Sequence, residues 1–180
     1  SSSGGWLREP PASFHEGSFL SPRGMVLMAG ADELPLLAAF EEEFEGSGVA
    51  MRRIDRAGLL SHCDGLRPHW QYGIEQESCA DIDVSSLHQA YLRVAKRSGA
   101  ELRCNAALVS AKHEGGRWRV ETRAGEVDAG ILVNAAGAWV DEVAICAGVR
   151  PIGISPFRRT MVQLSFDRRV SHALPLIDRK

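Results

Sequence analysis

The sequence lacks the patterns that mark several large classes of protein. No apolar run approaches the roughly 18 residues of a membrane-spanning helix. The formal net charge of −2 leaves no basic footprint for a nucleic acid. The four cysteines form no CxxC pair, which favours free structural thiols over a zinc site or a disulfide framework. We therefore expect a reduced, intracellular protein in the cytoplasm, with no nucleic-acid partner and no transmembrane segment.

The motifs of several enzyme classes are missing as well. No G-x-G-x-x-G stands between a strand and a helix, and the P-loop, the nucleophile elbow and H-E-x-x-H are absent. Ser61 and Ser155 have no base at a recognisable offset, which gives a hydrolase little support. Four histidines are isolated from one another, so surface or structural roles are favoured over a metal site: His62, His69, His88 and His113.

What is present is an ordinary globular composition. Of the 180 residues, 44% are hydrophobic and 24% are charged, which is enough to bury a core in one large or two small domains. The first residue is not Met, and the Ser/Gly run at the start is typical of a linker, so we expect residues 1–18 to be a linker or an exposed loop. We expect the chain to be a piece of a longer protein, and no pattern fixes its oligomeric state.

The clearest helical pattern covers residues 81–98. Apolar residues follow Leu87 at i+3, i+4, i+7 and i+8, which is the spacing of one helix face. Ser85 is the expected N-cap. The carboxylates of Asp81 and Asp83 precede the helix, so capping or stabilisation of the helix dipole explains them better than acid–base catalysis.

Shorter patterns predict the remaining elements. Helices are expected over residues 34–44, after Asp32 as an N-cap, and over 55–63. The expected strands cover residues 25–28, 70–74, 102–109 and 160–166. Alternating segments on both sides of Glu114-Gly-Gly116 predict a hairpin. Hairpins mixed with helix-to-strand units favour an α+β (mixed α/β) fold over an all-parallel sheet.

Residues 130–148 combine a strand pattern, a bare turn and a helix. Ile131–Val133 is a short apolar run, which predicts a buried strand. The turn Asn134–Gly137 has almost no side chains, and a helical spacing from Ala138 ends at Gly148. Small residues let another group approach the backbone, so the turn is either a phosphate- or cofactor-facing loop or a tight packing junction. The residue pattern alone leaves these two interpretations open.

Arg158 and Arg159 stand at the start of the last predicted strand. A planar guanidinium held at the start of a strand suits bidentate capture of a carboxylate. Because successive strand residues point to opposite faces, only one of the two could reach a given cavity. A pair of surface charges is the simpler alternative.

Four stretches in order along the chain resemble one known family. They are FLSPRGM from Phe19, ADIDVSSLHQAYLR from Ala80, LVNAAGAW from Leu132, and GVRP…PFRRT from Gly148 to Thr160. Together they resemble the FAD-dependent D-amino-acid oxidase family, in particular its D-amino-acid/D-arginine dehydrogenase and glycine/sarcosine oxidase branch.

The resemblance implies an FAD-binding domain interleaved with an antiparallel-sheet substrate domain. Residues 19–80 would belong to the substrate domain, residues 81–150 to the FAD-binding domain, and residues 151–180 to the substrate domain again. The implied reaction is oxidation of the C–N bond of an amino acid or related amine. A hydride passes from the α-carbon to the flavin, and the imino product hydrolyses. The implied partner is therefore a small-molecule amino acid or amine.

The resemblance also assigns roles to individual residues. Arg159 would hold the substrate carboxylate. The residues implied to contact FAD are Leu108, Val109, Ala135, Ala136, Gly137 and Trp139. No metal site is implied.

The chain departs from the family pattern in two respects. The N-terminal G-x-G-x-x-G is missing, so the alternative is that the isolated chain is a catalytically inactive domain without bound FAD. Members of the D-arginine branch carry an acidic residue just before the Met of the SPR stretch, whereas this chain reads Arg23-Gly24-Met25. A basic substrate is therefore not implied. The resemblance does not distinguish oxidase from dehydrogenase activity.

Overall fold

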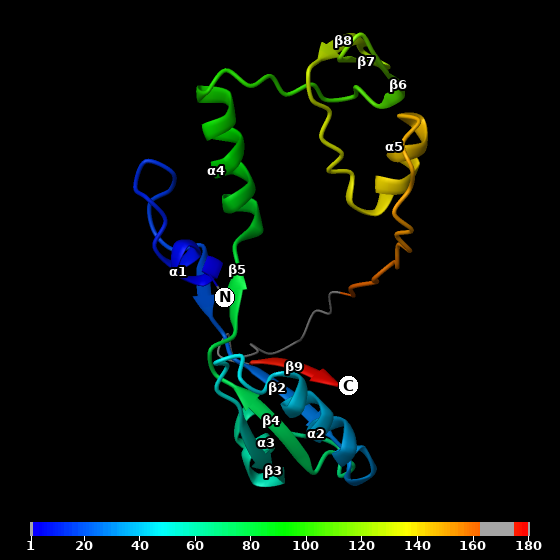
Figure 1. The fold of residues 1–180 in the computed structure, drawn as a ribbon. Coiled ribbons are helices and arrows are strands. Elements are labelled where there is room, and N and C mark those ends of the chain that lie inside the picture. Colours follow the sequence, from blue (N-terminus) through cyan, green and yellow to red (C-terminus); the bar gives the residue numbers. More distant parts are fainter. Residues whose placement is uncertain (1, 163–174, 180) are drawn as a thin grey trace. The chain divides into compact units, whose positions relative to one another are not determined.

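The computed structural model describes residues 2–162 and 175–179. The chain divides into two compact units, one of Ser1–Ser98 with Ser165–Lys180 and one of Gly99–Leu164. Helices and antiparallel or mixed sheets occur in both sequence halves, which confirms the predicted α+β class (Figure 1). In the described part of the chain, no helix is both long enough and apolar enough to cross a membrane. All four cysteines are free thiols.

The first unit contains a four-stranded mixed sheet. In spatial order its strands are β3 (Arg52–Asp55), β4 (Tyr72–Gln76), β2 (Met25–Ala29) and β9 (Leu176–Arg179). Strand β2 is antiparallel to β4 and parallel to β9. The sequence predicted β2 and, shifted by two residues, β4.

Two helices cover opposite faces of this sheet. Helix α2 (Leu34–Glu43) follows a 3₁₀ turn at Ala31–Glu33, and helix α3 (Arg56–His62) follows β3 directly. Because neighbouring strand residues point to opposite faces, β2 contributes side chains to two separate cores. One core consists of Leu27, Ala29, Ile74 and the α2 residue Leu37, and the other of Val26, Ile54 and the α3 residue Leu59.

A glycine near the start of β4 lets α3 lie close to the sheet. A Cβ atom on Gly73 would be 2.8 Å from the carbonyl oxygen of Leu27 and 2.8 Å from Cδ2 of Leu59. Both distances are shorter than van der Waals contact, and one of them is to backbone. The close approach of this helix therefore requires glycine here.

The N-terminal part of this unit packs on the longest helix. Strand β1 (Leu20–Pro22) pairs with β5 (Ala80–Ile82), which leads into α4 (Val84–Arg97). The N-cap of α4 is Asp83, for which a capping role was predicted, and not Ser85. Its carboxylate accepts the N–H of Ser86 at 2.9 Å and the hydroxyl of Ser86 at 2.7 Å. The hydroxyl bond in particular lowers the pKa of Asp83.

Residues Ser2–Arg8 form helix α1, whereas the sequence predicted a loop or linker. Trp6 lies 4.9 Å from Phe14 and 6.2 Å from Tyr91 of α4, measured between ring centroids. Phe19, which is 1% exposed, completes the cluster. These contacts between distant residues stabilise a segment whose composition indicates a loop.

The second unit is built on a three-stranded antiparallel sheet. Its strands are β6 (Leu108–Glu114), β7 (Arg117–Thr122) and β8 (Gly125–Ala129). The hairpin between the first two turns at Gly115 and Gly116, which both have positive φ, so the predicted hairpin is confirmed. Helix α5 (Val140–Cys146) packs against β6 and follows a 3₁₀ turn at Gly137–Trp139.

Two strand predictions fail in this unit, and a third lies largely outside the described residues. Ile131–Val133 is not a strand, and Ile131 and Val133 are 82% and 78% exposed. An apolar run becomes a strand only where its N–H and C=O groups find a partner, and none of the described strands pairs with it. The strand expected from residue 102 begins only at Leu108. Residues 160–162 are irregular, and the rest of the strand expected there lies outside the described residues.

Candidate functional site

The loop before α5 is held by its own asparagine. The side-chain Nδ2 of Asn134 donates to the carbonyl oxygen of Val140 at 2.8 Å, and its Oδ1 accepts the N–H of Ala136 at 3.2 Å. One amide side chain thus spans the turn and ties it to the first turn of the helix. The loop keeps a defined course although its other side chains are small.

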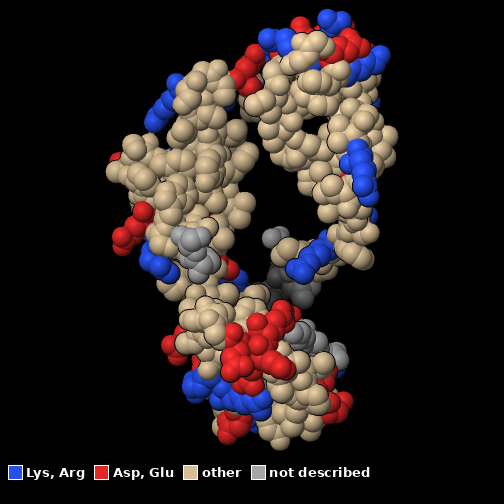
Figure 2. All heavy atoms as spheres, in the orientation of Figure 1, with Lys and Arg blue, Asp and Glu red and all other residues tan. Residues whose placement is uncertain are grey.

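The backbone of this loop is open to an incoming group. Gly137 has φ +57°, and a Cβ atom placed there would have no neighbour within 4 Å. Ala135 is exposed and Ala136 half-buried, while the Trp139 side chain is 63% exposed. Figure 2 shows charged side chains of both signs gathered over β6–β8, while the surface near α5 is largely uncharged apart from a basic group. The site is therefore an exposed, largely apolar surface with accessible main chain.

The strand residues predicted for the same site lie in the same unit. Leu108 is half-buried, and Val109 is 48% exposed. The pairing of β6 with β7 shifts register between Leu108 and Ser110, which is a β-bulge. Since α5 packs against β6, the structure brings the loop and this strand into one compact unit.

A second feature of α5 was not predicted. The carboxylate of Asp141, in the first turn of the helix, accepts three consecutive backbone N–H groups. Ile152 donates to Oδ1 at 3.0 Å, while Gly153 and Ile154 donate to Oδ2 at 2.9 and 2.8 Å. No residue spacing signals such a contact, because it depends on the path of the intervening chain.

The arginine pair follows this anchored segment. Residues 151–162 have no regular secondary structure, so Arg158 and Arg159 do not open a strand as predicted. Both side chains are exposed. Arg159 is therefore free to meet a ligand in solution, but its position comes from the irregular chain before it rather than from a sheet.

Arg23, which precedes the position where the D-arginine branch carries an acidic residue, has a partner of its own. Its guanidinium nitrogen lies 3.0 and 3.1 Å from the two carboxylate oxygens of Asp81. Ser21 and Asp81 are paired across β1 and β5, so this ion pair reinforces the two-stranded ribbon. A structural role explains both residues.

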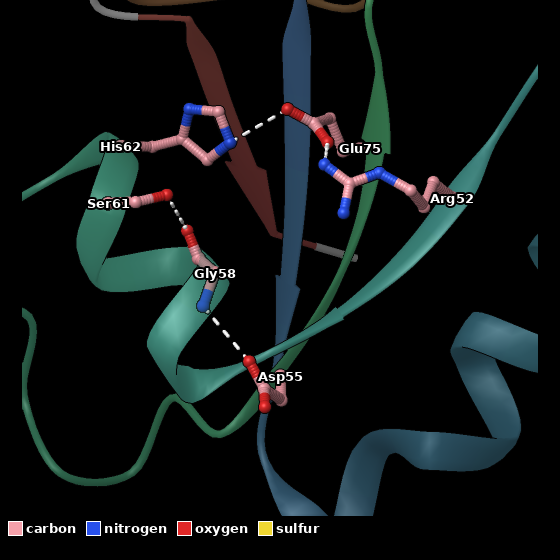
Figure 3. A network of polar contacts seen from close by, with 6 residues as sticks. All are labelled: Arg52, Asp55, Gly58, Ser61, His62 and Glu75. Atoms are coloured by element: carbon pink, nitrogen blue, oxygen red, sulfur yellow. Dashed lines mark hydrogen bonds and ion pairs between the residues drawn. The ribbon is translucent and has the colours of Figure 1, made fainter.

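A polar network of the first unit surrounds a buried carboxylate (Figure 3). Glu75 of β4 is 8% exposed, and its Oε1 lies 2.8 Å from Nε2 of His62. Its other oxygen pairs with the guanidinium of Arg52. Nearby, Asp55 caps α3 by accepting the N–H of Gly58 at 3.0 Å. The network joins β3, β4 and the end of α3, which fits the structural role predicted for His62.

Three possible metal ligands also approach one another. The ligating atoms of Asp32, Glu33 and His69 all lie within 4.8 Å. The Glu33 carboxylate already accepts the N–H of Gly30 at 2.9 Å, which closes the 3₁₀ turn before α2. Asp32 lies within that turn and is not the N-cap predicted for the helix. We assign the carboxylate of Glu33 to capping.

Two further carboxyl groups have a lowered pKa because each is hydrogen-bonded to an arginine. A hydrogen bond from Arg53 lowers the pKa of Glu41, and one from Arg103 lowers the pKa of Glu101. The Arg103–Glu101 pair is bidentate, at 2.8 and 2.9 Å. These exposed pairs contribute little to stability in water.

One family model matches nearly the whole chain. A family model described as FAD dependent oxidoreductase matches residues 5–178. The mitochondrial dimethylglycine dehydrogenase of Mus musculus is 38% identical over 78 residues, which is 43% of this chain and 9% of the relative. The chain thus spans about a tenth of the length of this curated relative.

Solved structures share the fold. The glycine oxidase from Geobacillus kaustophilus matches with a TM-score of 0.66 and 18% identity, over 82% of this chain and 39% of that one. The L-alpha-glycerophosphate oxidase from Mycoplasma pneumoniae, solved with FAD bound, matches with a TM-score of 0.65 and 14% identity, over 72% of this chain and 36% of that one. The chain spans well under half of either structure.

Proposed function

The chain belongs to the family of FAD-dependent oxidoreductases, and from this premise we propose that it is part of an enzyme that oxidises the C–N bond of an amino acid or related amine. The family match over residues 5–178 carries the proposal. The names of similar proteins support the substrate class, since dimethylglycine and glycine both carry an amine and a carboxylate. A small-molecule substrate of this kind needs a carboxylate anchor and a flavin surface.

The flavin surface is proposed to be the exposed loop before α5 together with the start of β6. FAD, when bound, supplies the acceptor for a hydride from the substrate α-carbon, and the imino product then hydrolyses. Small side chains and an uncovered backbone suit close approach of a large cofactor. The residues that would hold it are Leu108, Val109, Ala135, Ala136, Gly137 and Trp139.

The carboxylate anchor is proposed to be Arg159. A guanidinium offers two parallel N–H donors that match the two oxygens of a carboxylate, which fixes orientation as well as binding. The exposure of Arg159 supports the role. With the carboxylate held, the α-carbon would be presented in one orientation, and orientation is the main contribution of the protein to such a reaction.

The domain assignment forms part of the proposal. Residues 19–80 and 151–180 would belong to a substrate domain, and residues 81–150 to an FAD-binding domain. The two compact units have other boundaries, after Ser98 and after Leu164. Likewise, oxidase and dehydrogenase activity remain alternatives, and the location in the cytoplasm remains a prediction.

Visible absorption of the purified full-length protein tests the proposal. We expect a flavin spectrum that bleaches when an amino acid is added without oxygen. Absence of a flavin spectrum after incubation with FAD would contradict it. The 180-residue chain measured in parallel tests the alternative of an inactive domain, which predicts a colourless short chain beside a yellow full-length protein.

A further inference from the structure

We propose that Asp141 is a positioning residue for Arg159, because its carboxylate fixes the course of the chain that leads to the guanidinium. The inference deepens the proposed function and rests on it for the role of Arg159. It concerns residues of one compact unit only.

The contact is a nest of three N–H groups around one carboxylate. The N–H groups of Ile152, Gly153 and Ile154 reach the two oxygens of Asp141 at 2.8–3.0 Å. Gly153 has φ +85°, a left-handed conformation that favours glycine and turns successive N–H groups toward one point. Such a concavity binds an anion, and here the anion is the carboxylate of Asp141.

The chain beyond the nest has limited freedom. Pro151 and Pro156 bracket the anchored residues, and each fixes its own φ while restricting the residue before it. Arg159 is the fifth residue after Ile154, so the Cα of the arginine stays within about 18 Å of the anchor. An anchor followed by a proline defines the direction of the segment far better than a free coil would.

The other end of the contact is equally well defined. Asp141 lies two residues after Trp139, in the first turn of the helix that follows the proposed flavin loop. The far end of α5 is closed by Gly148, whose N–H bonds to Ile145, while the N–H of Val149 bonds to Ala144. These two bonds form a Schellman motif. The carboxylate thus links the flavin loop and the chain of the substrate arginine through one short helix.

A negative charge at a helix start is a simpler explanation for Asp141. Glu142 serves as the matched control, since it is an exposed acidic residue in the same turn. A general dipole effect predicts equal results for the two residues. The nest predicts that only Asp141 affects the distant arginine.

The test compares Asp141→Ala, Asp141→Asn and Glu142→Gln in the full-length flavin-loaded protein. For Asp141→Ala we expect the KM of a carboxylated substrate to rise about tenfold with kcat little changed, as for a loss of uniform substrate binding. Asp141→Asn keeps one acceptor oxygen, so its KM should lie between those of the wild type and Asp141→Ala. Glu142→Gln should match the wild type. Equal effects of Asp141→Ala and Glu142→Gln, or a loss of kcat alone, would overturn the proposal.

A readout independent of activity separates the two proposals. Hydrogen exchange of the amides of residues 152–154 should speed up in Asp141→Ala and in Gly153→Ala, and the double variant should exchange no faster than either single one. If exchange is unchanged, the positioning role is wrong. If exchange speeds up but Arg159→Ala leaves KM unchanged, the nest is present but positions no substrate anchor, which also overturns the proposal.

Discussion

His62 and Glu75 meet across the surface of the sheet, with Nε2 of the histidine 2.8 Å from Oε1 of a carboxylate that is 8% exposed. Arg52 binds the other oxygen. We expect Glu75→Ala to lower the free energy of unfolding by about 1–3 kcal/mol, because two donors then lose their shared acceptor. Urea unfolding measures this change in the free energy of unfolding. Exposed Glu77→Ala is the control, and an equal change in both variants would contradict the network.

The N-cap of α4 predicts a pH dependence. The pKa of Asp83 is lowered from its ordinary value of 3.8, chiefly by the hydroxyl of Ser86. Its stabilising effect is therefore fully present above pH 3.8 and is lost as the pH falls through the lowered folded-state pKa. Asp83→Ala should melt below the wild type at neutral pH but match it in strong acid. Asp83→Asn, which keeps a capping oxygen, should remove only the pH dependence. A constant difference between wild type and Asp83→Ala at all pH values would rule this out.

Gly73 offers a test of how closely α3 packs. Gly73→Ala should destabilise the protein by about 1–3 kcal/mol, because the new methyl group collides with a backbone oxygen and with Leu59. Chemical denaturation measures this change. Gly130→Ala is the control, since a Cβ there has no neighbour within 4 Å. Wild-type stability for Gly73→Ala would show that the helix shifts without cost.

Arg159 and Arg158 provide a matched pair for substrate binding. Arg159→Ala should raise KM for a carboxylated substrate about 10- to 150-fold, which corresponds to about 1.5–3 kcal/mol for a lost charged contact. Arg158→Ala, an equally exposed neighbour, should change KM little. Steady-state kinetics of the full-length protein distinguish them. Reversed effects would mean that the other arginine binds the substrate.

Gly137 tests the flavin loop. A side chain at φ +57° is strained and would stand over the exposed backbone, so Gly137→Ala should weaken FAD retention. Gly148→Ala introduces similar strain at the other end of α5, where φ is +64°. The flavin absorbance left after gel filtration should fall more for Gly137→Ala. An equal loss in both variants would indicate general destabilisation rather than loss of a cofactor contact.

Local patterns were enough to predict helices α2 to α5 and the hairpin. The spacing from Leu87 and the Gly115-Gly116 turn depend on neighbours in sequence, so the structure agrees with both. The family resemblance, carried by short motifs, agrees with the family match over nearly the whole chain. The predicted roles of Arg159 and of the loop residues remain untested.

Long-range contacts explain the failures. The Ile131–Val133 run has strand composition, but a strand also needs a partner that its own residues cannot specify. Helix α1 depends on aromatic contacts between Trp6 and residues up to Tyr91. The bonds of Asp141 reach 11 to 13 residues along the chain and follow no repeat.

The nest around Asp141 also has a consequence for sequence variation. The carboxylate binds main-chain N–H groups, so it places no demand on the side chains at positions 152 and 154, which are 75% and 46% exposed. Related sequences should therefore vary freely at these two positions within the limits of their other contacts. Asp141 and Gly153, in contrast, should be kept or exchanged as a pair. Without Gly153 the carboxylate loses its N–H donors, and without Asp141 the N–H groups lose their acceptor.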